Sequence, residues 1–426
     1  MEQFSTKEQY FEHLKRIGVV PEGFRLGIKQ ISFFPEERPV EVPLPMNLVL
    51  ILLEKPTESF GALFTRNKFP GAPVLIGRRR LNNALLRGVL INNKISNVGA
   101  PGGVEDAEGI LEKLASVAGG KAEEYVPAST GIIGWKLPKQ EILHNLLELT
   151  ASVGRFSCAD AAKAIMTTDA YPKVARRPLG NGSLVGFAKG AGMIEPNMAT
   201  MLVFLLTDVT IPRQILRKNL QKAAETTFNC ISVDGDQSTS DTVLCLSSGM
   251  KGSVSESEFL EALQGVCGDL AEHIVRNGEG TGHVIRVRVC SSPDFETARA
   301  LGKAVVNSPL VKTAVFGNDP NVGRILSSLG DYAGNHNLPL DPSRWTLQLG
   351  QEVIFAQGKF QLDKEKELRL AQYLKDASMD PALKPCPPHG KMVDIQVDLD
   401  AGSEEATVLG SDLSYEYVKE NADYRS

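Results

Sequence analysis

Short apolar runs separated by amphipathic stretches are the feature that most constrains how this chain of 426 residues folds. The most apolar runs, residues 48–53 and 201–206, are far shorter than the roughly 20 residues that a membrane-spanning helix needs. Their length is typical of buried β-strands, whereas residues 103–117 and 141–153 repeat apolar side chains with helical spacing. The pattern therefore predicts an α/β protein with no transmembrane segment.

The order of these signals predicts how the elements are layered. Strand-like and helical stretches are numerous, but they do not alternate with the regularity of a parallel βαβ sheet. We expect two mixed sheets packed between helical layers, an αββα-like arrangement, with a smaller C-terminal α/β part. The expected parts of the chain are residues 1–199, 200–292 and 293–426.

Two helices have clear boundaries in the sequence. Pro212 is expected at the first position of one helix, because proline has no N–H to lose there. A second helix should cover about residues 256–276 and end before Asn277 and Gly278, which are common at helix C-termini.

Composition limits the partners and cofactors. The 46 basic and 51 acidic residues give a net charge of −5, and the basic residues are dispersed, so nucleic acid is not an expected partner. Six scattered cysteines and six isolated histidines form neither a disulfide framework nor a zinc motif. No glycine-rich stretch fits a phosphate loop either, and from these absences together we expect no metal and no bound cofactor.

The N-terminus mixes acids with bases, unlike a signal peptide, and a cytoplasmic location is expected.

The segment "GFAKGAGMIEPNMATMLVFLL" leads from a glycine-rich run through Ala199 to Thr200 and an apolar strand. One interpretation is a simple turn before a strand. Under the other interpretation, the chain is cleaved before Thr200, and the new α-amine, with an unperturbed pKa of about 7.7–8.0, serves as the base for the adjacent hydroxyl. The Thr200 hydroxyl would attack the Ala199 carbonyl, and water would split the resulting ester.

An acyl-transfer nucleophile of this kind needs donors for the developing oxyanion. The segment "PASTGIIG" ends a predicted strand with the hydroxyl of Thr130 and then Gly131, whose N–H can closely approach a ligand. A turn without a catalytic role is the alternative interpretation.

Seven segments together resemble one known family. They are "STGIIG", "AIMTTDAYPK", "KGAGMIEPNMATML", "FNCISVDGDQSTSDT", "NGEGTGH", "FGNDPNVGR" and "ENADYRS". In this order they resemble the ornithine acetyltransferases (glutamate N-acetyltransferases) of cyclic arginine biosynthesis, over about residue 125 to the end. The chain departs from the family pattern in "LINNKISNVGAPGG", at Val322 in place of tryptophan and at Ser426 in place of threonine.

The resemblance implies roles for individual residues. Thr200 would be the nucleophile, released by self-cleavage after Ala199, and Thr130 and Gly131 would form the oxyanion hole. The "SVDGDQSTSDT" segment would have only a supporting role. The residues implied in substrate binding are Thr167, Lys189, Thr200, Glu279, Asn421 and Ser426.

The resemblance also implies a reaction, in which acetyl passes from N-acetyl-L-ornithine to L-glutamate, with acetyl-CoA as a further candidate donor. The two cleaved chains would assemble as a heterotetramer with two copies of each. Two alternatives stay open: an N-terminal-nucleophile amidohydrolase or aminopeptidase, in which water accepts the acyl group, and a non-catalytic paralogue retained for binding.

Overall fold

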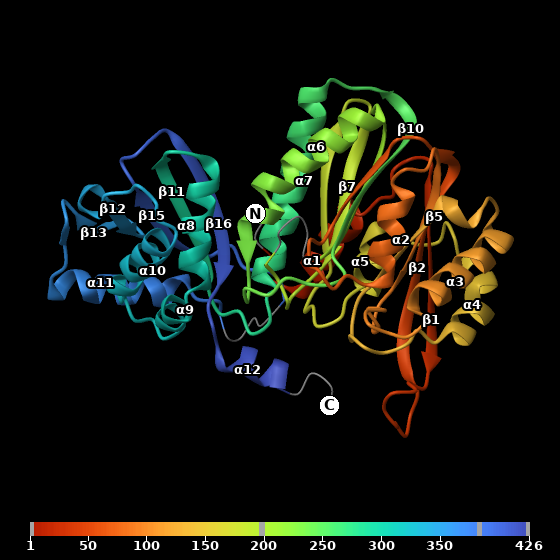
Figure 1. Cartoon of the computed structure of the whole chain (residues 1–426), viewed down its shortest axis with the longest axis horizontal. Coiled ribbons are helices and arrows are strands. Elements are labelled where there is room, and N and C mark those ends of the chain that lie inside the picture. The colour runs from red at the N-terminus through yellow and green to blue at the C-terminus, as the bar shows by residue number, and fades with distance from the viewer. Residues whose placement is uncertain (1–3, 196–200, 381–385, 423–426) are drawn as a thin grey trace.

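The computed structural model describes residues 4–195, 201–380 and 386–422. Figure 1 shows two bodies, a sandwich of sheets and helices formed mainly by the first two thirds of the chain, and a second body formed by the C-terminal third. Within the described residues the named strands form three sheets, of four, five and seven strands. Among these residues, no helix combines the length and apolar character required to cross a membrane.

Two of the sheets form the sandwich, and each contains both parallel and antiparallel pairs. The first sheet has the order β1-β2-β4-β5 and the second has the order β3-β10-β8-β7-β6. The strands of the first are β1 (Phe24–Phe33), β2 (Leu44–Thr57), β4 (Leu86–Asn92) and β5 (Tyr125–Ser129). Those of the second are β3 (Phe60–Phe64), β6 (Lys173–Leu179), β7 (Gly182–Lys189), β8 (Leu202–Thr210) and β10 (Thr242–Ser253).

Helices cover the outer face of each sandwich sheet. The first sheet is covered by α2 (Ala72–Arg80), α3 (Gly103–Ala118) and α4 (Lys139–Ala151), and the second by α6 (Arg213–Thr226) and α7 (Glu256–Arg276). Two further helices, α1 (Lys7–Ile17) and α5 (Cys158–Ala164), contribute to the core between the sheets. The predicted arrangement of two mixed sheets between helical layers is therefore confirmed.

The helix boundaries follow from local capping. The α7 helix begins after Ser255, whose side chain accepts from the N–H of Glu258 while the Glu258 carboxylate accepts from the N–H of Ser255. The predicted span 256–276 is confirmed. The prediction for Pro212 was wrong by one position: it is the N-cap of α6, with an extended backbone, and the helix starts at Arg213.

Strand β8 is the middle strand of the second sandwich sheet. It pairs with β7 on one side and β10 on the other, and every residue except the last is buried. The Phe187 and Phe204 rings meet between the sheets with their centroids 5.3 Å apart. The strongly apolar run that follows residue 200 is thus a central strand covered on both faces, which confirms the buried strand predicted from its length.

The C-terminal body has its own core around the third sheet. The strand order of this sheet is β14-β13-β12-β15-β11-β16-β9. Strands β9 and β11 both belong to it, although both precede the predicted boundary between residues 292 and 293. The division of the chain at that boundary stays a prediction. The strands are β9 (Ile231–Ser232), β11 (Val284–Ser292), β12 (Thr346–Leu349), β13 (Glu352–Ala356), β14 (Lys359–Phe360), β15 (Val393–Asp398) and β16 (Glu404–Ser411). The helices are α8 (Phe295–Asn307), α9 (Pro309–Phe316), α10 (Val322–Asn335) and α11 (Lys364–Ala377). Short 3-10 turns within the described residues are η1 (Ala122–Glu124), η2 (Phe228–Cys230) and η3 (Pro342–Arg344).

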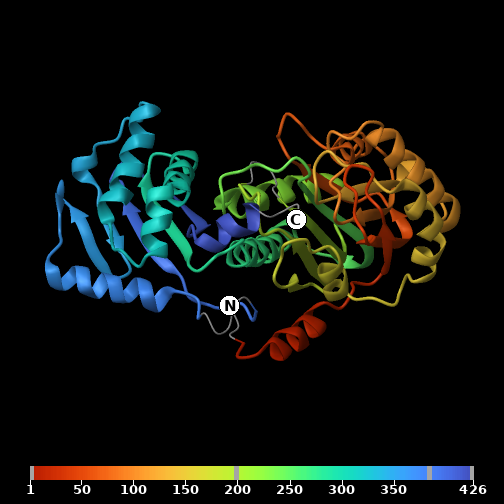
Figure 2. The same cartoon turned by 90° about the horizontal axis from the view of Figure 1, so that it is seen from below.

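The last described helix, α12 (Tyr415–Ala422), returns the chain toward the sandwich. Both views place it, at the blue end of the colour range, between the two bodies (Figures 1 and 2). Within the described helix no residue is buried, so α12 packs loosely against its neighbours.

The inter-sheet core gives a stability prediction. Phe204→Ala should lower the free energy of unfolding by about 3–5 kcal/mol, because it removes a fully buried ring and leaves a cavity. Thermal unfolding followed by circular dichroism should show a lower Tm. Phe34→Ala is the control, since the Phe34 side chain is 60% exposed and its loss should change Tm little. Equal shifts for the two variants would contradict the assigned core.

Candidate active site

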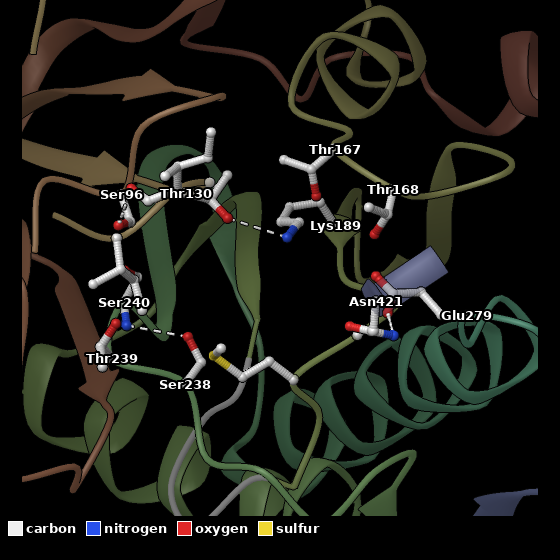
Figure 3. A pocket seen from close by; sticks show the side chains of 15 residues that line it. Ser96, Thr130, Thr167, Thr168, Lys189, Ser238, Thr239, Ser240, Glu279 and Asn421 are labelled. Carbon is white, nitrogen blue, oxygen red and sulfur yellow. Dashed lines mark hydrogen bonds between the residues drawn. The ribbon is translucent and has the colours of Figure 1, made fainter. Parts of the chain in front are cut away.

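A polar cavity of about 260 Å³ lies where the loops at one end of the two sandwich sheets meet α12 (Figure 3). Loops after β5, α5 and α7, the end of β7, and α12 all contribute to it. Six residues predicted for the site line this one cavity, although they are far apart in the sequence. They are Thr130, Gly131, Thr167, Lys189, Glu279 and Asn421. The other predicted residues, Ala199, Thr200 and Ser426, lie outside the described residues.

The loop after β5 leaves two hydrogen-bond donors available. The N–H groups on either side of Gly131 are occupied, because Thr130 donates to the Asn92 carbonyl over 3.1 Å and Ile132 to the Lys94 carbonyl over 2.8 Å. Among the described residues the Gly131 N–H and the Thr130 O–H donate to no acceptor. This segment can therefore present a backbone donor and a hydroxyl donor side by side, which is the arrangement that stabilises an oxyanion.

Gly131 is required at this position by its backbone. Its φ is 129°, which side-chain-bearing residues rarely adopt, and a Cβ atom here would clash with the backbone of Lys94. The absence of a side chain lets the two loops come into contact, and Gly131 itself lines the cavity.

Lys189 connects the two sheets across the cavity. It is the last residue of β7, and its Nζ donates to Thr130 Oγ1 over 3.1 Å (Figure 3). Because the Thr130 oxygen accepts this bond, the hydroxyl proton is directed elsewhere and can be donated to a ligand. Lys189 also places a positive charge beside the two donors.

A buried network holds the loop containing Thr167 against the end of β7. The Asp169 carboxylate accepts from Thr167 N–H over 3.0 Å, from Gly190 N–H over 2.8 Å and from Lys173 Nζ over 2.5 Å. Lys173 Nζ also donates to Asn277 Oδ1 over 2.6 Å. Burial acts to raise the pKa of Asp169, but the charges of Lys173 and Lys189 lower it from 3.8 to about 2. The carboxyl is therefore ionised at neutral pH.

Glu279 supplies a buried carboxylate on the opposite side of the cavity. Its Oε2 accepts from Asn421 Nδ2 over 2.9 Å, and its N–H donates to the Ala191 carbonyl over 3.0 Å. Gly192 packs directly against this carboxylate, and a Cβ atom at residue 192 would clash with it. The glycine in "KGAGMIEP" thus makes room for Glu279.

The "SVDGD" segment anchors the chain just before residue 196. Asp234 accepts from the N–H groups of Met193 over 2.7 Å and Ile194 over 2.8 Å, and Glu195 N–H donates to the Asp236 carbonyl over 2.9 Å. The segment, expected to have only a supporting role, thus holds residues 193–195 in place.

Sequence reasoning missed a group of hydroxyl residues in the cavity lining. Ser240 lines the cavity, and its buried hydroxyl has no hydrogen-bond partner among the described residues. The segment "DQSTSDT" was the available signal, but a run of polar residues does not reveal which of them face a cavity. The missed hydroxyl residues are Ser96, Thr168, Ser238, Thr239 and Ser240.

The described residues contain no cluster of three or more histidine, cysteine, aspartate or glutamate side chains placed to hold a metal ion. The site instead offers a hydroxyl and a backbone N–H, an ammonium and a carboxylate, held in a polar cavity of an αββα sandwich. These groups define a class of site that can bind a zwitterionic ligand and stabilise the oxyanion of acyl transfer.

Comparison with known proteins agrees with this class. The chain belongs to the ArgJ family, which matches residues 42–426. The arginine biosynthesis bifunctional protein ArgJ 2 of Nostoc sp. is 39% identical over 367 residues, or 85% of this chain and 89% of the relative. ArgJ of Geobacter sulfurreducens is 36% identical over 413 residues, or 94% of this chain and 100% of the relative. The ArgJ crystal structure from Bacillus halodurans is 32% identical, covers 52% of this chain and 98% of its own, and has a TM-score of 0.45. The resemblance noted in the sequence is confirmed at the level of the family.

The buried ion pair gives a pH-dependent prediction. A carboxyl whose folded pKa is lowered contributes stability above its unfolded pKa, and that contribution is lost as the pH falls through the folded pKa. Between about pH 4 and pH 2 the wild-type protein should therefore lose about 2 kcal/mol of unfolding free energy relative to Asp169→Asn/Lys173→Met. Urea unfolding across this range measures the difference, and identical acid profiles would contradict the assignment. The single variant Asp169→Asn is the control, because it should be destabilised even at pH 7 by the unpaired buried Lys173.

Proposed function

We propose that this protein is an acetyltransferase of arginine biosynthesis that moves acetyl from N-acetyl-L-ornithine to L-glutamate through an acetyl-Thr200 intermediate. The observation that carries the proposal is the meeting of Thr130, Gly131, Lys189 and Glu279 in one cavity. Family membership supports it, since relatives carry the name arginine biosynthesis bifunctional protein. The pairing of β7 with β8 supports it too. Lys189 of β7 lies opposite Leu202 of β8, and Leu202 follows Thr200 by two residues in the sequence.

Self-cleavage is the first proposed step. The Thr200 hydroxyl adds to the Ala199 carbonyl carbon, the peptide C–N bond breaks, and the nitrogen takes a proton to become the free α-amine of Thr200. Water then hydrolyses the ester, leaving a carboxylate on Ala199 and restoring the hydroxyl. The contacts of Asp234 with the N–H groups of residues 193 and 194 would hold the chain during this step.

Acetyl transfer uses the same groups. The α-amine of Thr200 takes the hydroxyl proton while the oxygen attacks the acetyl carbon of N-acetyl-L-ornithine. Gly131 N–H and Thr130 O–H donate to the oxyanion, the C–N bond breaks, and the ornithine amine takes the proton. The amine of L-glutamate then attacks acetyl-Thr200, and the same events in reverse release N-acetyl-L-glutamate.

Charge complementarity favours an amino acid over water as the acceptor. The Lys189 ammonium suits the α-carboxylate, and the Glu279 carboxylate suits the α-ammonium. Acetyl-CoA as an alternative donor, a heterotetramer of two copies of each cleaved chain and a cytoplasmic location belong to the same proposal.

Mass spectrometry tests the covalent chemistry. Purified protein should contain fragments 1–199 and 200–426, and incubation with N-acetyl-L-ornithine alone should add one acetyl group to the fragment that starts at Thr200. Thr200→Ala should show neither change. Initial rates with both substrates should give the parallel lines of ping-pong kinetics. Uncleaved but active protein would refute the mechanism, and acetate release at the same rate with or without glutamate would establish a hydrolase instead.

The oxyanion assignment has a separate test. Thr130→Ala should lower kcat by about 10²–10³-fold, since one donor to the oxyanion is lost while Gly131 N–H remains. Thr130→Ser keeps the hydroxyl and should retain most activity. Steady-state kinetics on self-cleaved protein separates this effect from slower maturation, and an unchanged kcat in Thr130→Ala would remove the residue from the mechanism.

A further inference from the structure

A second cavity, of about 360 Å³, adjoins the candidate active site. The two cavities share Gly131, Ile132, Thr167 and Thr168 as lining residues. The second cavity therefore lies directly beside the oxyanion donors, where the side chain of a bound substrate would be close to it.

Two residues give this cavity its charge. Lys94 and Glu420 are the charged side chains among the described residues that line it, and they have opposite signs. Both are exposed, and among the described residues neither side chain forms a hydrogen bond or an ion pair. Both charges are therefore available to a ligand at little desolvation cost.

The backbone fixes Lys94 relative to the oxyanion donors. Its φ is 71°, a left-handed conformation that is unfavourable for a residue with a side chain. The neighbouring loop holds it there, because the Lys94 carbonyl accepts from Ile132 N–H over 2.8 Å and Gly131 packs on its backbone. Strained residues held in this way are concentrated at ligand-binding sites.

The backbone of α12 positions Glu420 beside the active site. The next residue, Asn421, donates to Glu279 inside the first cavity. Although Glu420 is exposed, partial desolvation beside the active site and the nearby negative charges of Glu279 and Glu416 raise its pKa, and a bound cation would relieve that repulsion.

We propose that the second cavity is the subsite for the side-chain end of the amino-acid substrates, with Glu420 binding a terminal ammonium and Lys94 a terminal carboxylate. This rests on the proposed function. In a ping-pong reaction one site must hold both substrates in turn, and their side chains end in opposite charges: an ammonium in N-acetyl-L-ornithine and a carboxylate in L-glutamate. The α-carboxylate that both substrates share can use Lys189.

A subsite with one charge would attract one substrate and repel the other. With Lys94 and Glu420 both present, each terminal group meets an opposite charge, and the unused side chain stays hydrated because it is exposed. Exposed pairs are weak, so the discrimination should be modest.

Reciprocal variants test the subsite, because in ping-pong kinetics kcat/KM for each substrate is independent of the other substrate. Lys94→Met should lower kcat/KM for L-glutamate about fivefold and leave that for N-acetyl-L-ornithine unchanged. Glu420→Gln should do the opposite. Lys94→Arg should retain glutamate use, and Lys113→Met, on the exposed face of α3, is the matched control.

Two further measurements keep the test decisive. Lys94→Gly relieves the left-handed strain, so its loss of glutamate use cannot come from a distorted backbone. L-Norvaline, an acceptor whose side chain carries no charge, should be used equally well by the wild type and Lys94→Met. If the wild-type protein transfers acetyl but the variants change kcat/KM for the two charged substrates equally, or for neither, the subsite assignment is wrong. Absence of transfer in the wild type would instead refute the proposed function.

Discussion

The buried carboxylate of Asp169 is the interaction on which the arrangement of the site depends. It joins the loop that carries Thr167 to the backbone just after Lys189, and through Lys173 it reaches Asn277, two residues before Glu279. Three segments from different elements are thereby fixed by one ionised group. A buried charge of this kind is tolerated only when its partners are complete, which explains why backbone N–H groups and an ammonium converge on it.

The sandwich places complementary chemistry on its two sheets. The first sheet ends in the loop with the available Gly131 N–H, and the second sheet ends in Lys189, which reaches across to the Thr130 hydroxyl. Packing of apolar faces sets the distance between these loops, because the sheets have the Phe187 and Phe204 rings between them. The donors are held by the rigid ends of strands, as preorganised electrostatic stabilisation requires.

Local sequence determined the elements well where one physical signal dominated. The α7 helix has a capping box at its start and an asparagine after its end, and its predicted span matches the structure. The uninterrupted apolar run after residue 200 is a central strand because only such a strand is covered on both faces. Pro212 was misplaced by one residue because proline suits both the N-cap and the first helical position, so its fixed φ does not distinguish between them.

The sequence by itself therefore determined the layered α/β class, the family and the residues of the short motifs, since these depend on periodicity and on contiguous patterns. Only the tertiary structure decided which polar residues share a cavity, as with Ser240, and that Lys94 and Glu420 face the same adjoining space. It also revealed why Gly131 and Gly192 must lack side chains, one against a neighbouring backbone and the other against a carboxylate. These relations join residues far apart in the chain, and no local pattern encodes the packing that brings them together.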